Sequence, residues 1–208
     1  MSHRTHGAVC RRSASLQTRA LQLLVSFSML LTGSIAMALE EPKFEVIAEF
    51  DDVEIRRYEP YIVAEVDVPN GNSGFRALAG YIFGDNEQGE KMEMTAPVES
   101  RDSAIPDQYT YSFVMERKYS LDTLPRPEND EIRLLERPER IVAVRRFSGR
   151  WTDKNFRRQL DELLQTLEKE GIEPLGVPEQ ARYNSPFTPF FMRRNEVIIP
   201  VEWSKDPS

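Results

Sequence analysis

The 208-residue sequence predicts an α+β domain built from two similar halves, each with the order strand, strand, helix, strand. Two kinds of periodicity point to this fold class. Apolar residues alternate along several segments, as in strands, and recur every three to four residues in two others, as in helices. A third observation is that the same order of segments returns after 77 to 79 residues.

The first half is expected to start with extended chain from Lys43 to Val68, interrupted at Pro60. The turn-forming residues 70–74 then introduce a short helix. A further strand is predicted over residues 109–115, where aromatic and β-branched residues dominate. The predicted apolar face of the helix consists of Phe75, Leu78, Ala79 and Ile82.

The second half follows the Pro-rich, acidic connection 125–130. Its segments 131–133 and 141–143 match 54–56 and 62–64 of the first half, again with a proline between them. Two such units, of about 43–124 and 131–203, cannot each bury both faces alone. We therefore expect their sheets to pair around a shared core with the helices outside.

The second helix is expected to begin after Thr152, a good N-cap residue, and to end at Gly171. Its spacing of apolar residues is typical of a helix with one buried face. The residues of this stripe are Phe156, Leu160, Leu163, Leu164 and Leu167.

Residues 1–38 are predicted to be a signal peptide. Residues 1–19 contain four arginines and no acidic residue, and they are followed by the uncharged apolar segment 21–35. Residues 36–38 then have the small-x-small pattern of a cleavage site. A retained membrane anchor is the alternative, although polar residues dilute the segment. Arg11 and Arg12 leave open whether export is by the general or the twin-arginine route. We expect a periplasmic or secreted protein of residues 39–208 without an integral membrane segment.

Charge limits the partners of this exported portion. Removal of the leader takes away four arginines and no acidic residue, so the formal charge changes from −7 to −11. Nucleic acid is therefore not an expected partner, since phosphate binding depends on a surplus of Lys and Arg. The negative net charge also disfavours binding of the protein to anionic membrane surfaces.

The residues that carry much enzyme chemistry are missing from this portion. Cys10, His3 and His6 all belong to the leader, so residues 39–208 contain neither cysteine nor histidine. Disulfides, thiol nucleophiles, Ser-His-Asp triads and zinc sites with nitrogen or sulfur ligands are excluded. No spacing singles out a pair of carboxylates, and the acidic loops lack the calcium-loop pattern. We predict no catalytic residue and no metal site.

Several segments occur in one order along residues 39–208 and resemble the SOUL haem-binding protein family. The most specific are residues 94–98, with the sequence MTAPV, and 193–197, with RRNEV. The remaining segments are 44–47, 53–58, 74–84, 91–93 and 181–186. The resemblance implies a distorted, mostly antiparallel β-barrel with two flanking helices and two pseudo-symmetric halves, in agreement with the repeat.

The resemblance also implies a binding protein for haem, another tetrapyrrole or a similar flat amphipathic molecule. With no histidine or cysteine to bind the iron, such a ligand would be weakly held, by burial of the ring and by cations near its propionates. The ring-binding face that the resemblance implies consists of Phe75, Arg76, Ala79, Gly80 and Phe83.

Each of these candidates has a structural alternative. Phe75 and Ala79 belong to the predicted core stripe, whereas the outward-facing Arg76, Gly80 and Phe83 form either a ligand platform or an ordinary solvated surface. Met92 and Met94 alternate, which suits both an adaptable pocket, with a weak iron ligand, and core filling. An aromatic cluster is expected to pack at the end of the barrel or to form a wall of the cleft. It consists of Phe187, Phe190, Phe191 and Met192.

Two other function classes stay open. A hydrolase-type enzyme on the same fold would use Glu, Tyr or Ser, and an interaction module would bind a peptide or a membrane component. Absorbance on adding haemin, product formation from an ester panel, and partner capture distinguish the three classes.

Overall fold

The computed structural model describes residues 39–69 and 71–204. The predicted signal peptide therefore lies outside the described residues. The chain divides after Ala38 into two units, and the second of them, beginning at Leu39, holds all the elements described below.

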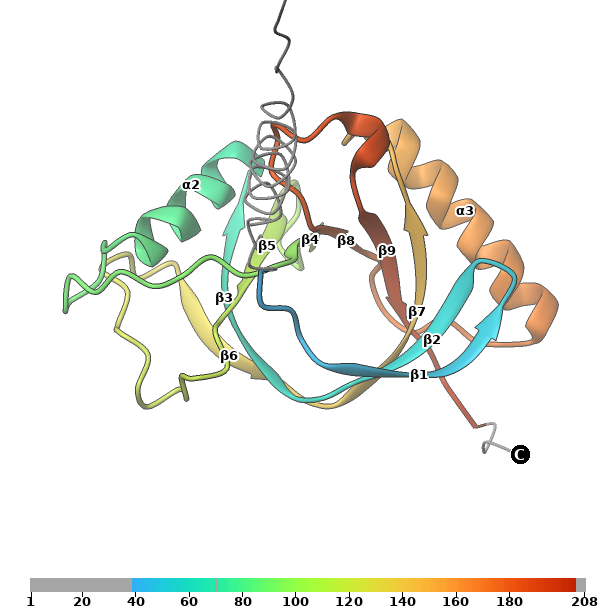
Figure 1. The fold of residues 1–208 in the computed structure, drawn as a ribbon, viewed down its shortest axis with the longest axis horizontal. Helices are drawn as coiled ribbons and strands as arrows, with labels where there is room; N and C mark the ends of the chain where they lie inside the picture. Colours follow the sequence, from blue (N-terminus) through green and yellow to red (C-terminus); the bar gives the residue numbers. More distant parts are fainter. Residues whose placement is uncertain (1–38, 70, 205–208) are drawn as a thin grey trace, which may run out of the picture. The chain divides into compact units, whose positions relative to one another are not determined.

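The described residues form one sheet of nine antiparallel strands, which curls into a half-barrel, and two α-helices (Figure 1). This confirms the predicted α+β class and its barrel-like sheet. The order of strands across the sheet is β1-β2-β7-β9-β8-β4-β5-β3-β6. The strands are β1 (Phe44–Phe50), β2 (Val53–Tyr58), β3 (Tyr61–Val68), β4 (Val98–Asp102), β5 (Tyr109–Val114), β6 (Arg133–Arg137), β7 (Arg140–Phe147), β8 (Glu179–Arg182) and β9 (Asn195–Pro200). The helices are α2 (Gly71–Ile82), α3 (Asp153–Glu170) and the short 3-10 helix η1 (Phe190–Met192).

The two halves have the same order of elements, β2-β3-α2-β4-β5 and β6-β7-α3-β8-β9. Their central strands β4 and β8 pair with each other in the middle of the sheet. The first strand of each half is exchanged, because β2 pairs with β7 and β6 pairs with β3. The halves thus interlock and share one sheet.

Helix α3 begins and ends where the sequence predicts. The hydroxyl of Thr152 accepts a hydrogen bond from the backbone N–H of Asn155, and Gly171 adopts a left-handed φ of 66° at the C-terminus. Leu163 and Leu167 are fully buried against the sheet. The other members of the predicted stripe, Phe156, Leu160 and Leu164, are partly buried in the same cluster.

Helix α2 buries part of the predicted face, Leu78 and Ile82, and adds Tyr81 to it. Leu78, Tyr81 and Ile82 face the sheet and are almost completely buried, whereas Phe75 is 45% exposed. Ala79 is partly buried at the edge of the cluster. Tyr81 tolerates burial because its hydroxyl donates a hydrogen bond of 2.8 Å to the carbonyl oxygen of Pro125.

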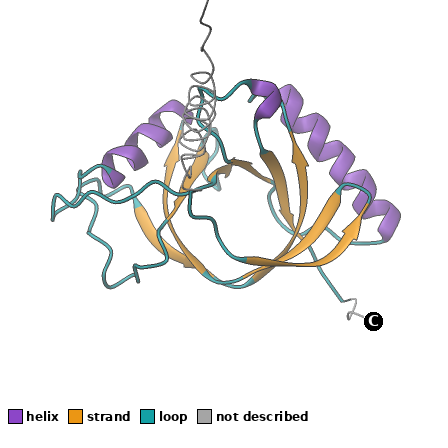
Figure 2. Cartoon of the chain, in the orientation of Figure 1, coloured by secondary structure: helices purple, strands orange, loops and turns teal. Residues whose placement is uncertain are grey.

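Both helices cover the same face of the sheet, on opposite flanks (Figure 2). Helix α2 packs on β3 and β5, and α3 packs on β7 and β9. Each helix closes its own apolar cluster, and a third cluster lies on the inner face of the half-barrel. The central strands β4 and β8 pair between these two flanks. The space between the helices, above these strands, is where a groove can form.

We expect Leu163→Ala to lower the free energy of unfolding by about 2 to 5 kcal/mol, because the side chain is fully buried and its loss leaves a cavity. Leu164→Ala should cost less, since Leu164 is only partly buried. Arg158→Ala should be nearly silent, because this exposed side chain only bonds Asn155 one helical turn away. Urea unfolding of the three variants measures the order, and equal losses would contradict this helix phase.

Candidate functional site

A groove of about 510 Å³ lies on the helix-covered face of the sheet, between the two helices. Its floor comes from β4, β5 and β8, and its walls come from α2, from the residue that precedes Thr152 and from the chain after β8. Most of its lining residues are apolar or aromatic, as is usual for small-molecule sites. The lining residues are Asn72, Phe75, Val98, Tyr111, Trp151, Arg182, Asn184 and Pro186.

Close packing at Gly74 brings α2 to one wall of the groove. A Cβ atom at this position would lie 2.8 Å from Cγ of Tyr111 and 2.9 Å from Cγ2 of Val68. Only glycine therefore lets α2 approach the sheet this closely. The next residue, Phe75, turns its ring over Phe113 with ring centroids 5.4 Å apart, and its exposed part lines the groove.

Trp151 forms the opposite wall, and its orientation is fixed by hydrogen bonding. Its indole N–H donates a bond of 2.7 Å to Oδ1 of Asn195, which is completely buried at the start of β9. The guanidinium of Arg193 lies 4.2 Å from the centre of the indole ring. The Trp151 ring is thus held as a rigid aromatic wall.

Arg182 is the charged group of the groove. One of its Nη atoms donates to Oε1 of Gln180 at 2.7 Å, and its guanidinium lies 5.3 Å from the Trp151 ring centre. Its Nε atom is buried and has no hydrogen-bond partner among the described residues. None of the ion pairs within this part of the chain involves Arg182. An unpartnered guanidinium donor in an apolar groove suits a carboxylate ligand.

A second hollow of about 260 Å³ continues along the same strands. Val98 pairs with Arg182 at the first groove, and the next pair on this face, Ser100 with Gln180, lines the second. Phe156 and Leu160 of α3 add apolar walls, while charged side chains of β4 and α3 surround them. The polar second hollow extends the space beside the apolar groove.

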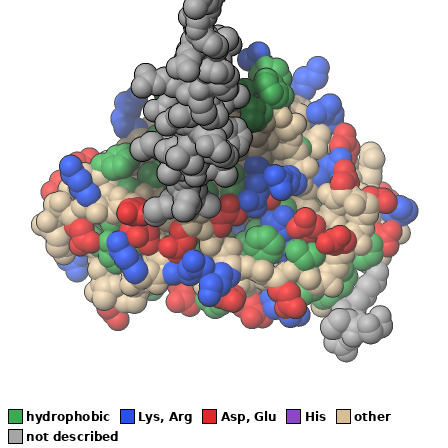
Figure 3. Space-filling model, viewed as in Figure 1, with side chains coloured by type: hydrophobic (Ala, Val, Ile, Leu, Met, Phe, Trp, Pro, Cys, Tyr) green, Lys and Arg blue, Asp and Glu red, His purple; other side chains and the backbone are tan. Residues whose placement is uncertain are grey.

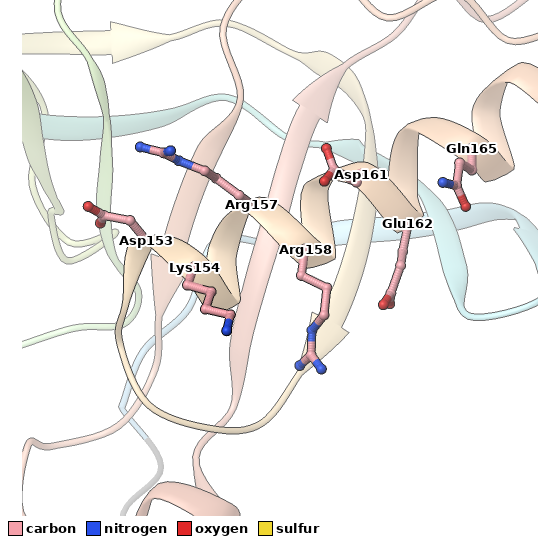
Figure 4. A pocket seen from close by; sticks show the side chains of 7 residues that line it. All are labelled: Asp153, Lys154, Arg157, Arg158, Asp161, Glu162 and Gln165. Carbon is pink, nitrogen blue, oxygen red and sulfur yellow. The ribbon is translucent and has the colours of Figure 1, made fainter.

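A third hollow, about 620 Å³, does not offer a comparable site. All seven of its lining residues project from the outer side of the single helix α3 (Figure 4). Five of them are charged and exposed, and no second element encloses the space. We interpret it as a solvated helix surface.

The structure does not bring all the predicted ligand-binding residues together. Phe75 lines the groove, but Arg76 of α2 and Phe83, which follows α2, are exposed without lining it, and Gly80 is partly exposed. Ala79, Met92 and Met94 pack in the cluster beneath α2, with Met92 buried and the other two partly buried. The burial of Met92 in this cluster therefore agrees with the alternative that it fills the core. Contact of the remaining residues with a ligand stays a prediction.

The sequence analysis missed Trp151 and Arg182 as groove residues. The segment 181–186 carried part of the family resemblance, yet the sequence did not tell which of its side chains face the helices. Arg182 and Tyr183 point to opposite faces because they are neighbours in extended chain. Strand register against β4 and β9 decides between them, and register is not visible in the sequence.

The opposite, inner face of the sheet holds a buried cluster of charges. Arg137 of β6 donates to Glu99 of β4 at 2.6 Å and to Glu179 of β8 at 3.3 Å. Arg140 of β7 forms a bidentate pair with Glu179 at 2.9 and 3.1 Å and also donates to the Tyr61 hydroxyl at 2.8 Å. Neither Glu99 nor Glu179 lines any of the three hollows. Apart from Nε of Arg140, which is buried without a hydrogen-bond partner among the described residues, the charged groups of the cluster bind one another, and the cluster serves the structure.

Burial and charge act in opposite directions on these carboxyl groups. Burial raises the pKa of Glu99 more than the nearby Arg137 lowers it. Burial also acts to raise the pKa of Glu179, but Arg137 and Arg140 outweigh it and lower that pKa below the ordinary value. Burial raises the pKa of Tyr61, so its phenol stays protonated. Glu179 is therefore the firmly ionised member of the pair.

Two negative findings concern the described residues alone. They contain no group of three or more His, Cys, Asp or Glu side chains placed to hold a metal ion. In the same part of the chain, no helix is long and apolar enough to span a membrane.

Comparison with known proteins gives a match over almost the whole described unit. Residues 39–200 match the family described as SOUL heme-binding protein. Heme-binding protein 2 of Mus musculus is 32% identical over 182 residues, covering 80% of this chain and 88% of that protein. Heme-binding protein 2 of Homo sapiens is 32% identical over 162 residues, covering 70% of this chain and 76% of that protein.

Solved structures support the fold. The structure of a hydrolase from Listeria innocua aligns with a TM-score of 0.55 at 12% identity, covering 74% of this chain and 94% of that one. At this level of identity the similarity concerns the fold alone.

We expect Glu179→Gln to destabilise the protein by about 3 to 5 kcal/mol, because it leaves the buried Arg140 without its charged partner. Glu99→Gln should cost less, about 1 to 2 kcal/mol, because burial already opposes the charged form of Glu99 and Arg137 keeps Glu179 as a partner. Urea unfolding near pH 7 compares the two, and a larger loss for Glu99→Gln would contradict the assignment of charge.

The pH dependence of the same variants gives an independent check. A lowered folded pKa means that Glu179 contributes its stabilisation above its unfolded pKa of about 4.3 and loses it as pH falls through the folded value. Glu179→Gln should therefore lose less stability than the wild type between about pH 5 and pH 3.

Proposed function

Because this chain belongs to the SOUL haem-binding protein family, we propose that it binds haem, or a related flat amphipathic tetrapyrrole, in the groove between α2 and α3. The groove volume of about 510 Å³ lies within the range of about 300 to 1,000 Å³ for small-molecule sites. Phe75 and Trp151 supply aromatic walls on opposite sides of the groove. Such walls suit the faces of a planar ring.

Arg182 carries the proposal. A buried guanidinium Nε without a partner costs free energy unless a ligand or water satisfies it. The carboxylates of a tetrapyrrole are acceptors of the right charge for this donor. An apolar groove with a single such cation favours a molecule that is flat and apolar in its body and anionic at its edge. The residues present therefore fit the ring and its carboxylates.

The same residues do not offer a strong iron ligand. Residues 39–208 contain no histidine and no cysteine, and the methionines 92 and 94 pack beneath α2. When bound, haem would be held as cargo, with ring burial and the Arg182 contact supplying most of the free energy. Partial burial of a ring contributes on the order of 10 kcal/mol at about 25 cal/mol per Å², before the cost of association. We propose exchangeable, micromolar or weaker binding, suited to carriage or buffering.

We further propose that binding takes place outside the cytoplasm. The arginine-bearing segment, the apolar run that follows it and the small residues at 36 and 38 support an exported carrier.

We expect haemin and protoporphyrin IX to bind residues 39–208 with dissociation constants within about tenfold of each other, which is 1.4 kcal/mol. The reason is that the iron adds little without an imidazole or thiolate. Absorbance and fluorescence titrations measure both constants. A sharp six-coordinate low-spin haemin spectrum would contradict the proposal, as would binding of neither ring.

Arg182→Gln should weaken both ligands by about tenfold, since it removes the charged donor but keeps an amide of similar reach. Arg76→Ala is the comparison variant, because Arg76 belongs to the face that the resemblance implies but is exposed on α2 without lining the groove. A larger effect of Arg76→Ala than of Arg182→Gln would move the carboxylate contact to the face that the resemblance implied.

Export predicts a defined N-terminus. Expressed from its full gene in a Gram-negative host, the protein should be recovered from the periplasm starting at or near Leu39, because signal peptidase accepts the small residues at 36 and 38. N-terminal sequencing checks this. Recovery of the intact leader in the membrane pellet would contradict it.

A further inference from the structure

The loop between β8 and β9 exposes a cluster of large apolar side chains. The exposed fractions are 96% for Phe187, 44% for Phe190, 66% for Phe191 and 65% for Met192. The sequence analysis expected this cluster to pack at the barrel end or to form a cleft wall. Instead, the four side chains form a protruding surface, which we call the aromatic tip. Contiguous exposed apolar groups of this kind mark a contact with a protein or a membrane.

The aromatic tip is held in place by hydrogen bonds. The Arg193 side chain donates to the carbonyl oxygens of Thr188 and Pro186 at 2.8 and 2.7 Å. The N–H of Gly149 donates to the carbonyl oxygen of Phe190 at 2.9 Å, which ties the loop to the chain before α3. The apolar side chains are therefore presented to solvent by a fixed backbone.

Cations without acidic partners border this tip. Arg150 lies 4.8 Å from the ring centre of Phe190, and Arg193 braces the loop from below. Neither forms an ion pair with an acidic residue within residues 39–69 and 71–204, whereas the neighbouring Arg194 is paired with Glu41 and Glu196. Figure 3 shows hydrophobic side chains at this edge of the molecule with Lys and Arg side chains beside them. The local charge is thus opposite to the net charge of −11 for residues 39–208.

We infer that the aromatic tip docks on an anionic lipid surface. Phenylalanine and methionine side chains can enter the boundary between headgroups and acyl chains, while the exposed Arg150 beside Phe190 meets lipid phosphates. Charge complementarity favours anionic lipid over neutral lipid.

Docking in this way would place the groove at the lipid surface. Pro186 lines the groove and Phe187, the most exposed aromatic residue of the tip, follows it directly. If the proposed function holds, an amphipathic ligand dissolved in the membrane could enter the groove without crossing water. The docking itself needs no ligand and can be tested without one.

The test uses residues 39–208, which contain every described element, so that the apolar leader does not contribute. Co-sedimentation is measured with vesicles of phosphatidylcholine mixed with phosphatidylglycerol, and with vesicles of phosphatidylcholine alone. We expect binding to the mixed vesicles, with weaker binding at about 1 M than at about 0.1 M salt, because the Debye length shrinks from about 10 to about 3 Å. Arg150→Gln should reduce this binding several-fold.

The double variant Phe187→Ser/Phe191→Ser should lower the vesicle partition coefficient by about tenfold or more. Its matched control is Ile105→Ser/Leu121→Ser, which removes two apolar side chains of 46% and 44% exposure from the β4–β5 and β5–β6 loops. Equal partition of the two double variants would overturn the inference. Failure of the wild type to bind the vesicles would also overturn the inference. If the wild type then self-associates and Phe187→Ser/Phe191→Ser abolishes this, the tip is a protein interface.

Failure of docking and failure of ligand binding give different results. Haemin titration of Phe187→Ser/Phe191→Ser in solution should match the wild type, because neither side chain lines the groove. If the wild type binds vesicles with the same affinity with and without haemin, docking is supported. This holds even if the haemin titration shows that the protein binds no haemin.

Discussion

The curl of the sheet depends on guanidinium groups that cross its inner face. Arg137 belongs to the edge strand β6, yet it bonds Glu99 and Glu179 on the two central strands, and Arg140 of β7 meets Glu179 from the other side. These bonds tie both flanks of the half-barrel to its middle. Because the inner face is thereby occupied, the space for a ligand lies on the outer face, between the helices. Removing one partner would leave a buried charge unpaired, which is the costly way to lose such a cluster.

The groove follows from how the two helices sit on that outer face. Each helix covers the strands of one flank, and the pairing of β4 with β8 sets the width between them. Gly74 lets one helix approach closely, and Trp151 stiffens the other side. The residues that hold the groove are therefore mostly different from those that would touch a ligand.

The helices and strands could be predicted because local sequence signals determine them. The residues of the site could not, because long-range packing brings them together. Thr152 and Gly171 act within one helical turn, so the ends of α3 could be predicted from residue types. The burial of Tyr81 on α2 could not be predicted in this way, because it depends on a distant carbonyl, that of Pro125, which accepts a hydrogen bond from its hydroxyl. Arg182 enters the groove through strand pairing with β4, a partner more than eighty residues away in sequence. The aromatic residues 187–192 were expected to pack because their type usually does.

The exchange of strands between the halves has a consequence for how the chain folds. Within the first half, the hairpin of β1 and β2 has no strand pairing with β3, β4 or β5, and it joins them only through β7, β9 and β8 of the second half. In the same way, strand β6 of the second half pairs with β3 of the first half. The ladders that join the two halves, β2–β7, β3–β6 and β4–β8, thus wait for residues that are synthesised later, and closing such distant pairs is slow. The sheet therefore becomes continuous from β1 to β6 only when β8 and β9, the last strands of the chain, take their places between β7 and β4.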